Sequence, residues 1–520
     1  MYRRIRRFQN ARPRHAVARL FSSAMIVLPL WLWPYSPAAQ AITAVPLRPA
    51  VLSHASSSTA MSFSGARPPL ASSSDAATRR HTDTAPIQIK ERGRATSLSH
   101  RQSIRVPPPR RSRAPHDGGY WEGIEAHMTV EGGIAGNPWT RSARNFGQFY
   151  LDRANTLTLD QILGTVSHAM TDIGAGYRLG FVAEAMYGSD SRFDVTIGMG
   201  DRALSGMYQW APTQAHIDLH TPWLFGRGID FQIGQSYGLM GTEGTAALSR
   251  PFYSFNYSSD FIVPFQTVGV IATAHIGPRL DGILGVDAGN STTFGQSSNN
   301  NRPKGYLGVS FTHLLGDRLD GHLIGRAGPQ GHDGDSRLSP EGWVSAGIGE
   351  AAAHRMQVNA DLLLAYHPSK TLSVTFGSTW LHDEVPDDDA WGSTAYLAWD
   401  VTPALRLNLR AEVFRDNTGV LIAAYPGTTS FGKQLRNQPY PFYAAPPTTY
   451  GDLTLGLRYE PGLHNRHRPL GRVVLRPEIR VDQSLNGTRP FNRDAPALDP
   501  IVRNGDSTML WFSCDMIWSF

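Results

Sequence analysis

Segments of about ten residues that alternate apolar and polar side chains recur from about residue 120 onward. Clear examples are MQVNADLLLAYH (356–367), TLSVTFGSTWLH (371–382) and LRLNLRAEVFRD (405–416). Successive side chains of a β-strand point to opposite faces, so a period of two indicates strands with one apolar face. About sixteen such segments can be distinguished, with 14 to 18 compatible, at a density of about 25 residues per strand and connection. The sequence therefore predicts an all-β fold.

The connections between these segments differ in length in a regular way. Short turns such as TDIG (171–174), HPSKT (367–371) and TPAL (402–405) alternate with long connections such as 239–262 and 416–450. Short turns on one rim and long loops on the other are typical of a transmembrane antiparallel β-barrel. After residue 41, no apolar run reaches the length of about 18 residues that a membrane-spanning helix needs. We therefore expect a closed barrel in a membrane.

The segment MLWFSCDMIWSF (509–520) is expected to close this barrel against the first strand. One face is continuously apolar and is expected to contact lipid: Leu510, Phe512, Cys514, Met516, Trp518 and Phe520. The other face would turn Ser513, Asp515 and Ser519 toward a wet interior. Cys514 is the single cysteine, which excludes an intramolecular disulfide and a cysteine-built metal site. The alternating pattern ending in Phe resembles the signal that the outer-membrane barrel assembly machinery reads.

The first 118 residues differ from the rest in composition. An Arg-rich start, the apolar run Leu20–Trp33 and the small-x-small site at Ala39–Ala41 predict a signal peptide over residues 1–41. Residues 42–118 are rich in Ser, Pro and Arg and poor in large apolar residues, which predicts a disordered periplasmic tether whose role is open. The barrel is assigned to residues 119–520.

Charge follows the same division. Residues 1–118 hold 19 Lys and Arg against 4 Asp and Glu, whereas residues 119–520 hold 30 against 39. The basic excess therefore lies outside the predicted folded part. A nucleic-acid-binding protein would carry that excess on a folded surface, so we expect no nucleic-acid partner.

Polar side chains on three consecutive late strands are expected to face the barrel interior. The pore-lining candidates are Arg406, Arg410, Glu412, Arg458, Glu460, Arg476, Glu478, Arg480 and Asp482. So many charges are tolerable where they line water, but they would be costly in a protein core. Two interpretations stay open: a charged wall that selects solutes, or a ladder of paired charges that only braces the barrel. The mixture of signs leaves the preference for cations or anions undetermined.

The motif HIDLH contains His216 and His220 at a spacing that resembles a metal site. On a strand, however, four residues span about 13 Å. The two histidines could not share an ion without ligands from elsewhere, so we predict two interior histidines and no metal site. No nucleophile motif or phosphate-binding loop occurs in a supporting context. We therefore expect no enzyme activity, no catalytic residues and no cofactor.

Several stretches together resemble the OmpL-like family of β-barrel porins. They include GFVAEAMYGSD, FQIGQSYGLMGTEG, LDGILGVDAGNSTTFG and LRPEIRVDQS, in an order that covers nearly all of the predicted barrel. The resemblance implies a Gram-negative outer-membrane pore for passive diffusion of small hydrophilic solutes, without catalytic residues. The outer-membrane bilayer and the assembly machinery would be its partners.

Sixteen-stranded porins also suggest, by analogy, that residues Leu239 to Val263 fold inward as a constriction. Glu243 and Asp260 would then oppose the arginine wall. A plugged structural or surface-binding barrel and a barrel hydrolase are the competing interpretations. The size of the chain is compatible with a homotrimer, which the sequence does not establish, and the solute stays unidentified.

Overall fold

The structure is a computed structural model in which residues 123–520 are described, with gaps. The gaps cover residues 142, 171–175, 202–205, 225–226, 296–301, 330–354, 385–387, 420, 423–445, 462–470 and 493–504. The signal peptide and tether expected over residues 1–118 lie outside the described residues. Among the described residues, no helix has the length and apolar character needed to cross a bilayer.

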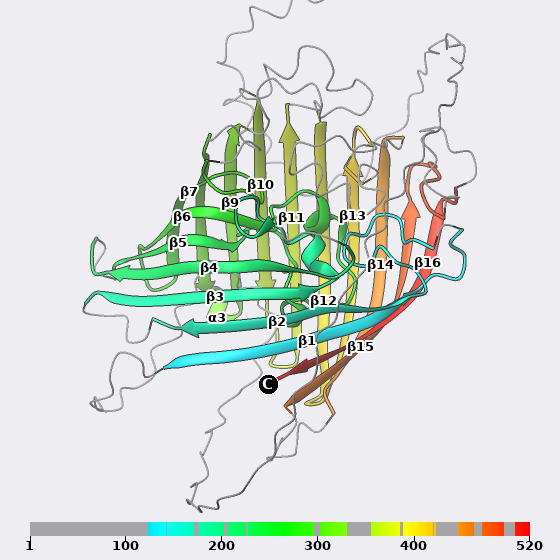
Figure 1. Cartoon of the computed structure of the whole chain (residues 1–520), viewed down its shortest axis with the longest axis horizontal. Helices are drawn as coiled ribbons and strands as arrows, with labels where there is room; N and C mark the ends of the chain where they lie inside the picture. Colours follow the sequence, from blue (N-terminus) through cyan, green and yellow to red (C-terminus); the bar gives the residue numbers. More distant parts are fainter. Residues whose placement is uncertain are drawn as a thin grey trace, which may run out of the picture. The chain divides into compact units, whose positions relative to one another are not determined.

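Sixteen antiparallel strands form a closed barrel in which each strand pairs with its neighbours along the chain (Figure 1). The strands are β1 (Ile124–Gly136), β2 (Leu157–His168), β3 (Arg178–Gly188), β4 (Gln209–Thr221), β5 (Ile229–Tyr237), β6 (Gln266–His275), β7 (Leu280–Asp287), β8 (Lys304–His313), β9 (Leu319–Pro329), β10 (Met356–Tyr366), β11 (Leu372–Asp383), β12 (Asp388–Thr402), β13 (Leu405–Asp416), β14 (Thr448–Tyr459), β15 (Arg472–Ser484) and β16 (Thr508–Ser519). Short helical turns are η2 (Asp190–Arg192), η4 (Ala247–Ser249), α2 (Tyr257–Phe261) and α3 (Leu314–Asp317). The predicted fold class and the strand number of sixteen are confirmed.

β16 closes the barrel against β1, as the sequence predicts. Gly136 pairs with Phe512 at one end of the ladder and Thr129 pairs with Ser519 at the other. Phe512, Met516 and Trp518 are exposed on the outer face, whereas Met509, Trp511 and Ile517 are buried on the inner face. Closure pairs the edge strands, so no edge of the sheet is left open to lipid.

Two connections depart from the expected alternation of lengths. β11 and β12 are joined by a short connection between Asp383 and Asp388 on the rim of the long loops. β14 and β15 are joined by a longer one between Tyr459 and Arg472 on the rim of the short turns. Antiparallel closure requires only that neighbouring strands pair, so the length of an individual connection is free to vary.

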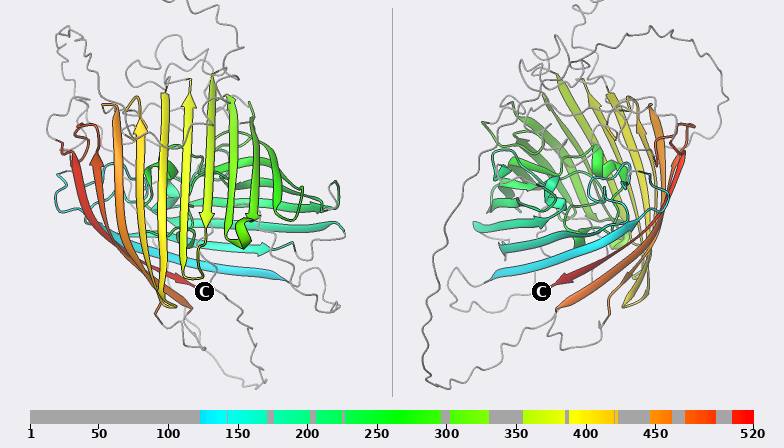
Figure 2. Two further views of the ribbon diagram at one scale, coloured as in Figure 1. Left: turned by 180° about the vertical axis from the view of Figure 1, so that it is seen from behind. Right: turned by 45° about the vertical axis from the view of Figure 1, so that its right-hand side comes forward.

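The connection between β5 and β6 lies inside the barrel, where Figure 2 shows α2 enclosed by strands. We call residues Leu239–Val263 the inward segment. Its side chains form the largest buried apolar cluster together with the barrel wall, and Tyr253, Tyr257, Phe414, Tyr450 and Trp511 are all fully buried there. The barrel interior is therefore partly a protein core and not only a wall around water.

Candidate functional site

The nine predicted pore-lining residues fall into two groups. Six lie beneath the inward segment and are almost fully buried: Arg410, Glu412, Arg476, Glu478, Arg480 and Asp482. Three lie nearer the rim of the short turns, where their side chains keep about an eighth of their exposure: Arg406, Arg458 and Glu460. The first group contacts protein instead of open water. The role of all nine in lining a pore stays a prediction.

Two wall carboxylates hold the backbone of the inward segment by its N–H groups. Glu412 of β13 accepts hydrogen bonds from the backbone N–H groups of Tyr257 at 2.7 Å and Ser258 at 2.9 Å. Glu478 of β15 accepts from those of Tyr253 at 2.9 Å and Ser254 at 3.1 Å. A buried backbone N–H needs a partner, and a loop inside a barrel has no ladder to supply one. The carboxylates supply it.

Three wall arginines bind the carbonyl groups of the same segment. Arg476 donates to the carbonyls of Ala247 at 2.9 Å and Arg250 at 2.8 Å. Arg410 donates to Ser254 O at 2.8 Å. Arg480 likewise donates to the carbonyl of Phe255. A loop that folds into the barrel presents backbone N–H and C=O groups. Carboxylates of the wall accept hydrogen bonds from the N–H groups, and guanidiniums donate hydrogen bonds to the C=O groups. This explains why the ladder mixes the two signs.

The remaining charges beneath the segment are paired with one another. Arg410 contacts Glu243 at 2.9 Å and Asp452 at 2.7 Å. Arg250 of the segment contacts Glu131 of β1 at 2.8 Å. Buried charges are tolerated only when they are paired and hydrogen-bonded, so removing one partner of such a pair is expected to be costly. Glu243 therefore contacts an arginine of the wall, and its role in a constriction stays a prediction.

Asp260, the second constriction candidate, has different surroundings. It lies on α2, and its Oδ2 accepts only a long hydrogen bond, 3.4 Å, from the backbone N–H of Phe149. Its other oxygen has no partner among the described residues. Burial raises the pKa of the Asp260 carboxyl well above its usual range. Burial therefore disfavours a charge on Asp260 that would oppose the arginines.

Glycines on the inner face of the wall make room for the segment. A Cβ atom at Gly377 of β11 would meet Thr242 Cγ2 at 2.0 Å, and one at Gly392 of β12 would meet Ser258 Oγ at 1.9 Å. Real Cβ atoms do not approach this closely, so a larger residue at either position would force the Thr242 or Ser258 side chain of the segment to move. These two positions are shaped for a segment that lies against the wall.

The inward segment crosses the whole barrel. Gln161 of β2 donates to Thr245 O at 2.7 Å, and Asn359 of β10 donates to Ile262 O at 2.8 Å. β2 and β10 are eight positions apart in a ring of sixteen strands, which places them on opposite walls. The segment is therefore fixed to both sides of the interior.

An aromatic cluster joins the inward segment to two other long loops. Tyr150, from the connection between β1 and β2, stacks on Phe255 with ring centroids 4.5 Å apart. Phe149 stacks on Phe193 of the β3–β4 connection at 5.0 Å and packs against Phe261 of α2 at 4.6 Å. This cluster narrows the interior at the level of the inward segment.

The interior near the short turns is more open. Arg406 of β13 forms a salt bridge with Asp400 of β12, and a third of the Asp400 side chain is exposed. Arg458 contacts Glu460 at 3.1 Å, and Arg472 also contacts Glu460. These pairs are partly solvated, so they face space that water can enter.

The two histidines of the HIDLH motif are both buried on the inner face of β4 but have separate partners. His216 Nδ1 lies 3.0 Å from Asp218 Oδ1, and its other ring nitrogen lies 3.4 Å from Gln232. His220 Nδ1 lies 2.6 Å from Asp230 Oδ1 of β5. Both histidines thus lie on the inner face of β4, and the absence of a metal site stays a prediction.

Sequence reasoning missed the partner of Arg476 and Arg250 at the centre of the wall. Both guanidiniums contact Glu131 of β1, which is fully buried. Glu131 occupies the polar face of its segment, and this is the only feature of the sequence that indicates an inward position for it. Arg250 lies in a loop without periodicity, so nothing in its neighbourhood indicates a buried ion pair.

Comparison with solved structures finds outer-membrane proteins that are covered almost completely by about three quarters of this chain. The outer-membrane channel DcaP of Acinetobacter baumannii is 10% identical, with 76% of this chain and 97% of that chain covered and a TM-score of 0.45. An anion-selective porin from Comamonas acidovorans is 11% identical, with 76% and 99% covered and a TM-score of 0.43. OprB of Pseudomonas putida is 13% identical, with 76% and 94% covered and a TM-score of 0.44.

A search of curated proteins returns no match. A family model does match, and it spans residues 123–520, which is the whole barrel and about three quarters of the chain. The match includes every strand, the inward segment and the charged wall. The chain therefore belongs to the OmpL-like β-barrel porins, the family described as "putative beta-barrel porin-2, OmpL-like", which are barrels of the Gram-negative outer membrane.

Proposed function

We propose that this protein is a water-filled channel for the passive diffusion of small hydrophilic solutes, in which the inward segment forms the narrowest section. The observation that carries the proposal is that the inner face of β13–β15 stays charged from the inward segment to the rim of the short turns. The inner face of β13–β15 binds the segment through charged groups and continues toward the short turns with the partly exposed Arg406, Arg458 and Glu460. Sixteen strands are also enough to enclose an aqueous channel.

A second candidate is a plugged barrel whose interior passes no solute. It is favoured by the anchoring of the inward segment to opposite walls through Gln161 and Asn359. The aromatic cluster of Phe149, Tyr150 and Phe255 adds to this. In that case the barrel would have a structural or surface-binding role, and its loops would contact the partner.

Conductance of the purified protein in a planar lipid bilayer separates the two candidates. The variant Gly392→Val introduces side-chain atoms where Ser258 of the segment lies, without changing a charge. The matched control is Gly164→Val in β2, where a Cβ would meet nothing within 4 Å. If the barrel is a channel with a constriction, the wild-type protein should conduct and the Gly392→Val variant should conduct more. The Gly164→Val control should have the wild-type conductance.

The other outcomes are equally informative. A silent wild type whose Gly392→Val variant conducts would support the plugged barrel. If neither protein conducts and both are folded, the channel proposal is wrong. Equal conductance in wild type and Gly392→Val would mean that the inward segment does not lie in the path of the ions.

The cellular context that we propose follows from the same interpretation. The chain would be exported by the signal peptide at residues 1–41 and inserted by the barrel assembly machinery, with the pattern of β16 as its signal. The size of the chain is compatible with a homotrimer, and we expect no enzyme activity. Cross-linking of the protein in native outer membranes would test the trimer.

A further inference from the structure

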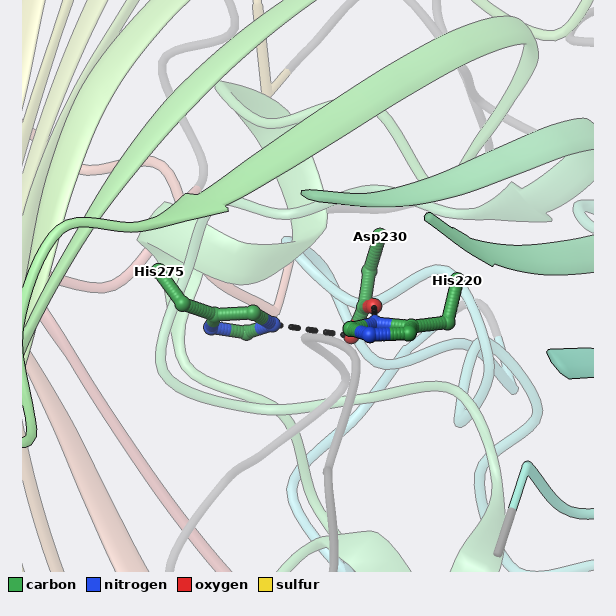
Figure 3. Close-up of side chains that lie close together, drawn as sticks. All are labelled: His220, Asp230 and His275. Carbon is green, nitrogen blue, oxygen red and sulfur yellow. Dashed lines mark hydrogen bonds and ion pairs between the residues drawn. The ribbon is translucent and has the colours of Figure 1, made fainter. Parts of the chain in front are cut away.

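Three side chains from adjacent strands converge inside the barrel near the short turns, away from the inward segment. They are His220 of β4, Asp230 of β5 and His275 of β6, shown in Figure 3. His220 Nδ1 lies 2.6 Å from one carboxylate oxygen of Asp230, and His275 Nε2 lies 3.0 Å from the other. One nitrogen or oxygen atom from each residue lies within 4.8 Å of the other two.

The salt-bridge partners of the buried Asp230 carboxylate are histidines. Its side chain is fully buried, and within the described part of the chain its salt bridges are to these two histidines and to no Lys or Arg. A buried carboxylate is normally balanced by a permanent positive charge or by a metal ion. The two imidazoles can give that balance only by holding a proton or by sharing a cation with the carboxylate.

The ring of His275 is oriented as in a metal ligand. Its Nδ1 lies 2.9 Å from Asp281 Oδ1 of β7, which leaves Nε2 directed at the centre of the cluster. Histidines that bind metals usually donate their second nitrogen to a carboxylate, which fixes the tautomer and the ring plane. Asp281 has this position, and its side chain is only partly buried.

The ring of His220 is held on its far side by the backbone. A Cβ atom at Gly228 would meet His220 Cε1 at 2.6 Å and Nε2 at 2.9 Å, and Gly228 has a φ of +88°. A glycine is therefore needed here for conformation and for space. The close backbone leaves Nδ1 as the nitrogen that faces Asp230.

We propose that His220, Asp230 and His275 bind one divalent transition-metal ion, with Asp281 as a positioning residue. Two imidazole nitrogens and one carboxylate oxygen are a donor set that suits Zn²⁺ and its neighbours in the first transition row. Zn²⁺ bonds of about 2.0–2.2 Å require tetrahedral ligand atoms to lie roughly 3.3 Å apart. The present separations of 2.6 and 3.0 Å therefore need to widen by about 0.7 and 0.3 Å when the ion enters.

The ion would join three strands that are already paired and would have room for a ligand from the interior. His220 and Asp230 are buried, whereas the His275 side chain keeps 13% of its exposure and that of Asp281 keeps 27%. A fourth coordination position would therefore open toward the barrel interior, where water or a solute carboxylate could occupy it. This inference does not depend on whether the barrel conducts.

The experiment is a calorimetric titration in which Zn²⁺ is added to the folded full chain in detergent. Because the chain has 18 histidines, variants must identify the site. His220→Gln and His275→Gln should each weaken the tight site by at least about 100-fold, and Asp281→Asn by about 10- to 100-fold. His216→Gln is the matched control, since His216 lies on the same inner face of β4 and bonds elsewhere. It should bind as wild type.

A second measurement covers variants that fail to fold. Wild-type protein loaded with one equivalent of Zn²⁺ should show two imidazole ligands and only nitrogen and oxygen donors by X-ray absorption spectroscopy. The proposal is overturned if wild type has no tight 1:1 site, if fewer than two imidazoles are seen, or if folded His220→Gln and His275→Gln bind as wild type does. The cluster would then be a protonated histidine between two aspartates.

Discussion

Removing the Glu412 carboxylate should release the inward segment from the barrel wall. In Glu412→Ala, the backbone N–H groups of Tyr257 and Ser258 lose their acceptor, as does the Ser258 hydroxyl. Each buried donor left without a partner costs about 1–3 kcal/mol, so the two amides together weaken docking by about 2–6 kcal/mol. A change of about 1.4 kcal/mol alters an equilibrium constant tenfold, so the ratio of docked to undocked protein falls by roughly 30-fold to 10⁴-fold.

Amide hydrogen exchange of the detergent-solubilised protein measures this directly, because the reporting amides are those of Tyr257 and Ser258. Their exchange should accelerate by the same factor as the docking equilibrium, while amides of the barrel strands stay protected. Glu460→Ala is the matched control, since Glu460 is a carboxylate that contacts arginines and not the segment. Equal protection of Tyr257 in wild type and Glu412→Ala would refute the assignment of Glu412 as the anchor.

Three further predictions concern other parts of the molecule. Arg406→Gln with Arg458→Gln should shift the reversal potential in a salt gradient toward cations, whereas Arg279→Gln at an exposed turn should not. Burial raises the pKa of Asp194, in the β3–β4 connection, to about 8. The native state then binds a proton more tightly than the unfolded state does. The free energy of unfolding should therefore fall as the pH rises from about 4 to about 8. Asp194→Asn should flatten that part of a melting-temperature profile. Leu453→Arg on the outer face of β14 should cost about 2–4 kcal/mol in denaturant unfolding from lipid vesicles, and an unchanged midpoint would argue that this face does not contact lipid.

The period of two along the chain is sufficient to predict the barrel. It assigns the faces of β13, β14 and β16, because alternation along a strand places each side chain on one side without knowledge of its neighbours. Leu453 and Leu455 outside, and Arg410 and Asp452 inside, follow from that rule alone. The number of strands follows from counting such segments.

The inside of the barrel could not be derived in this way. Glu131 and Arg250 are 119 positions apart, and Arg476 contacts Glu131 across 345 positions. Which charges meet depends on the depth of each strand in the ring and on the path of a segment that has no periodicity. The same holds for His220 and His275, which the register of β4, β5 and β6 brings to one aspartate.

The sequence by itself thus decided which side chains face lipid and which face inward, because that choice is local and repeats every second residue. Only the tertiary structure decided which inward charges contact water, which satisfy the backbone of the inward segment, and which surround Asp230. Those outcomes depend on groups from distant strands arriving at the same depth, and alternation along one strand carries no information about depth on another.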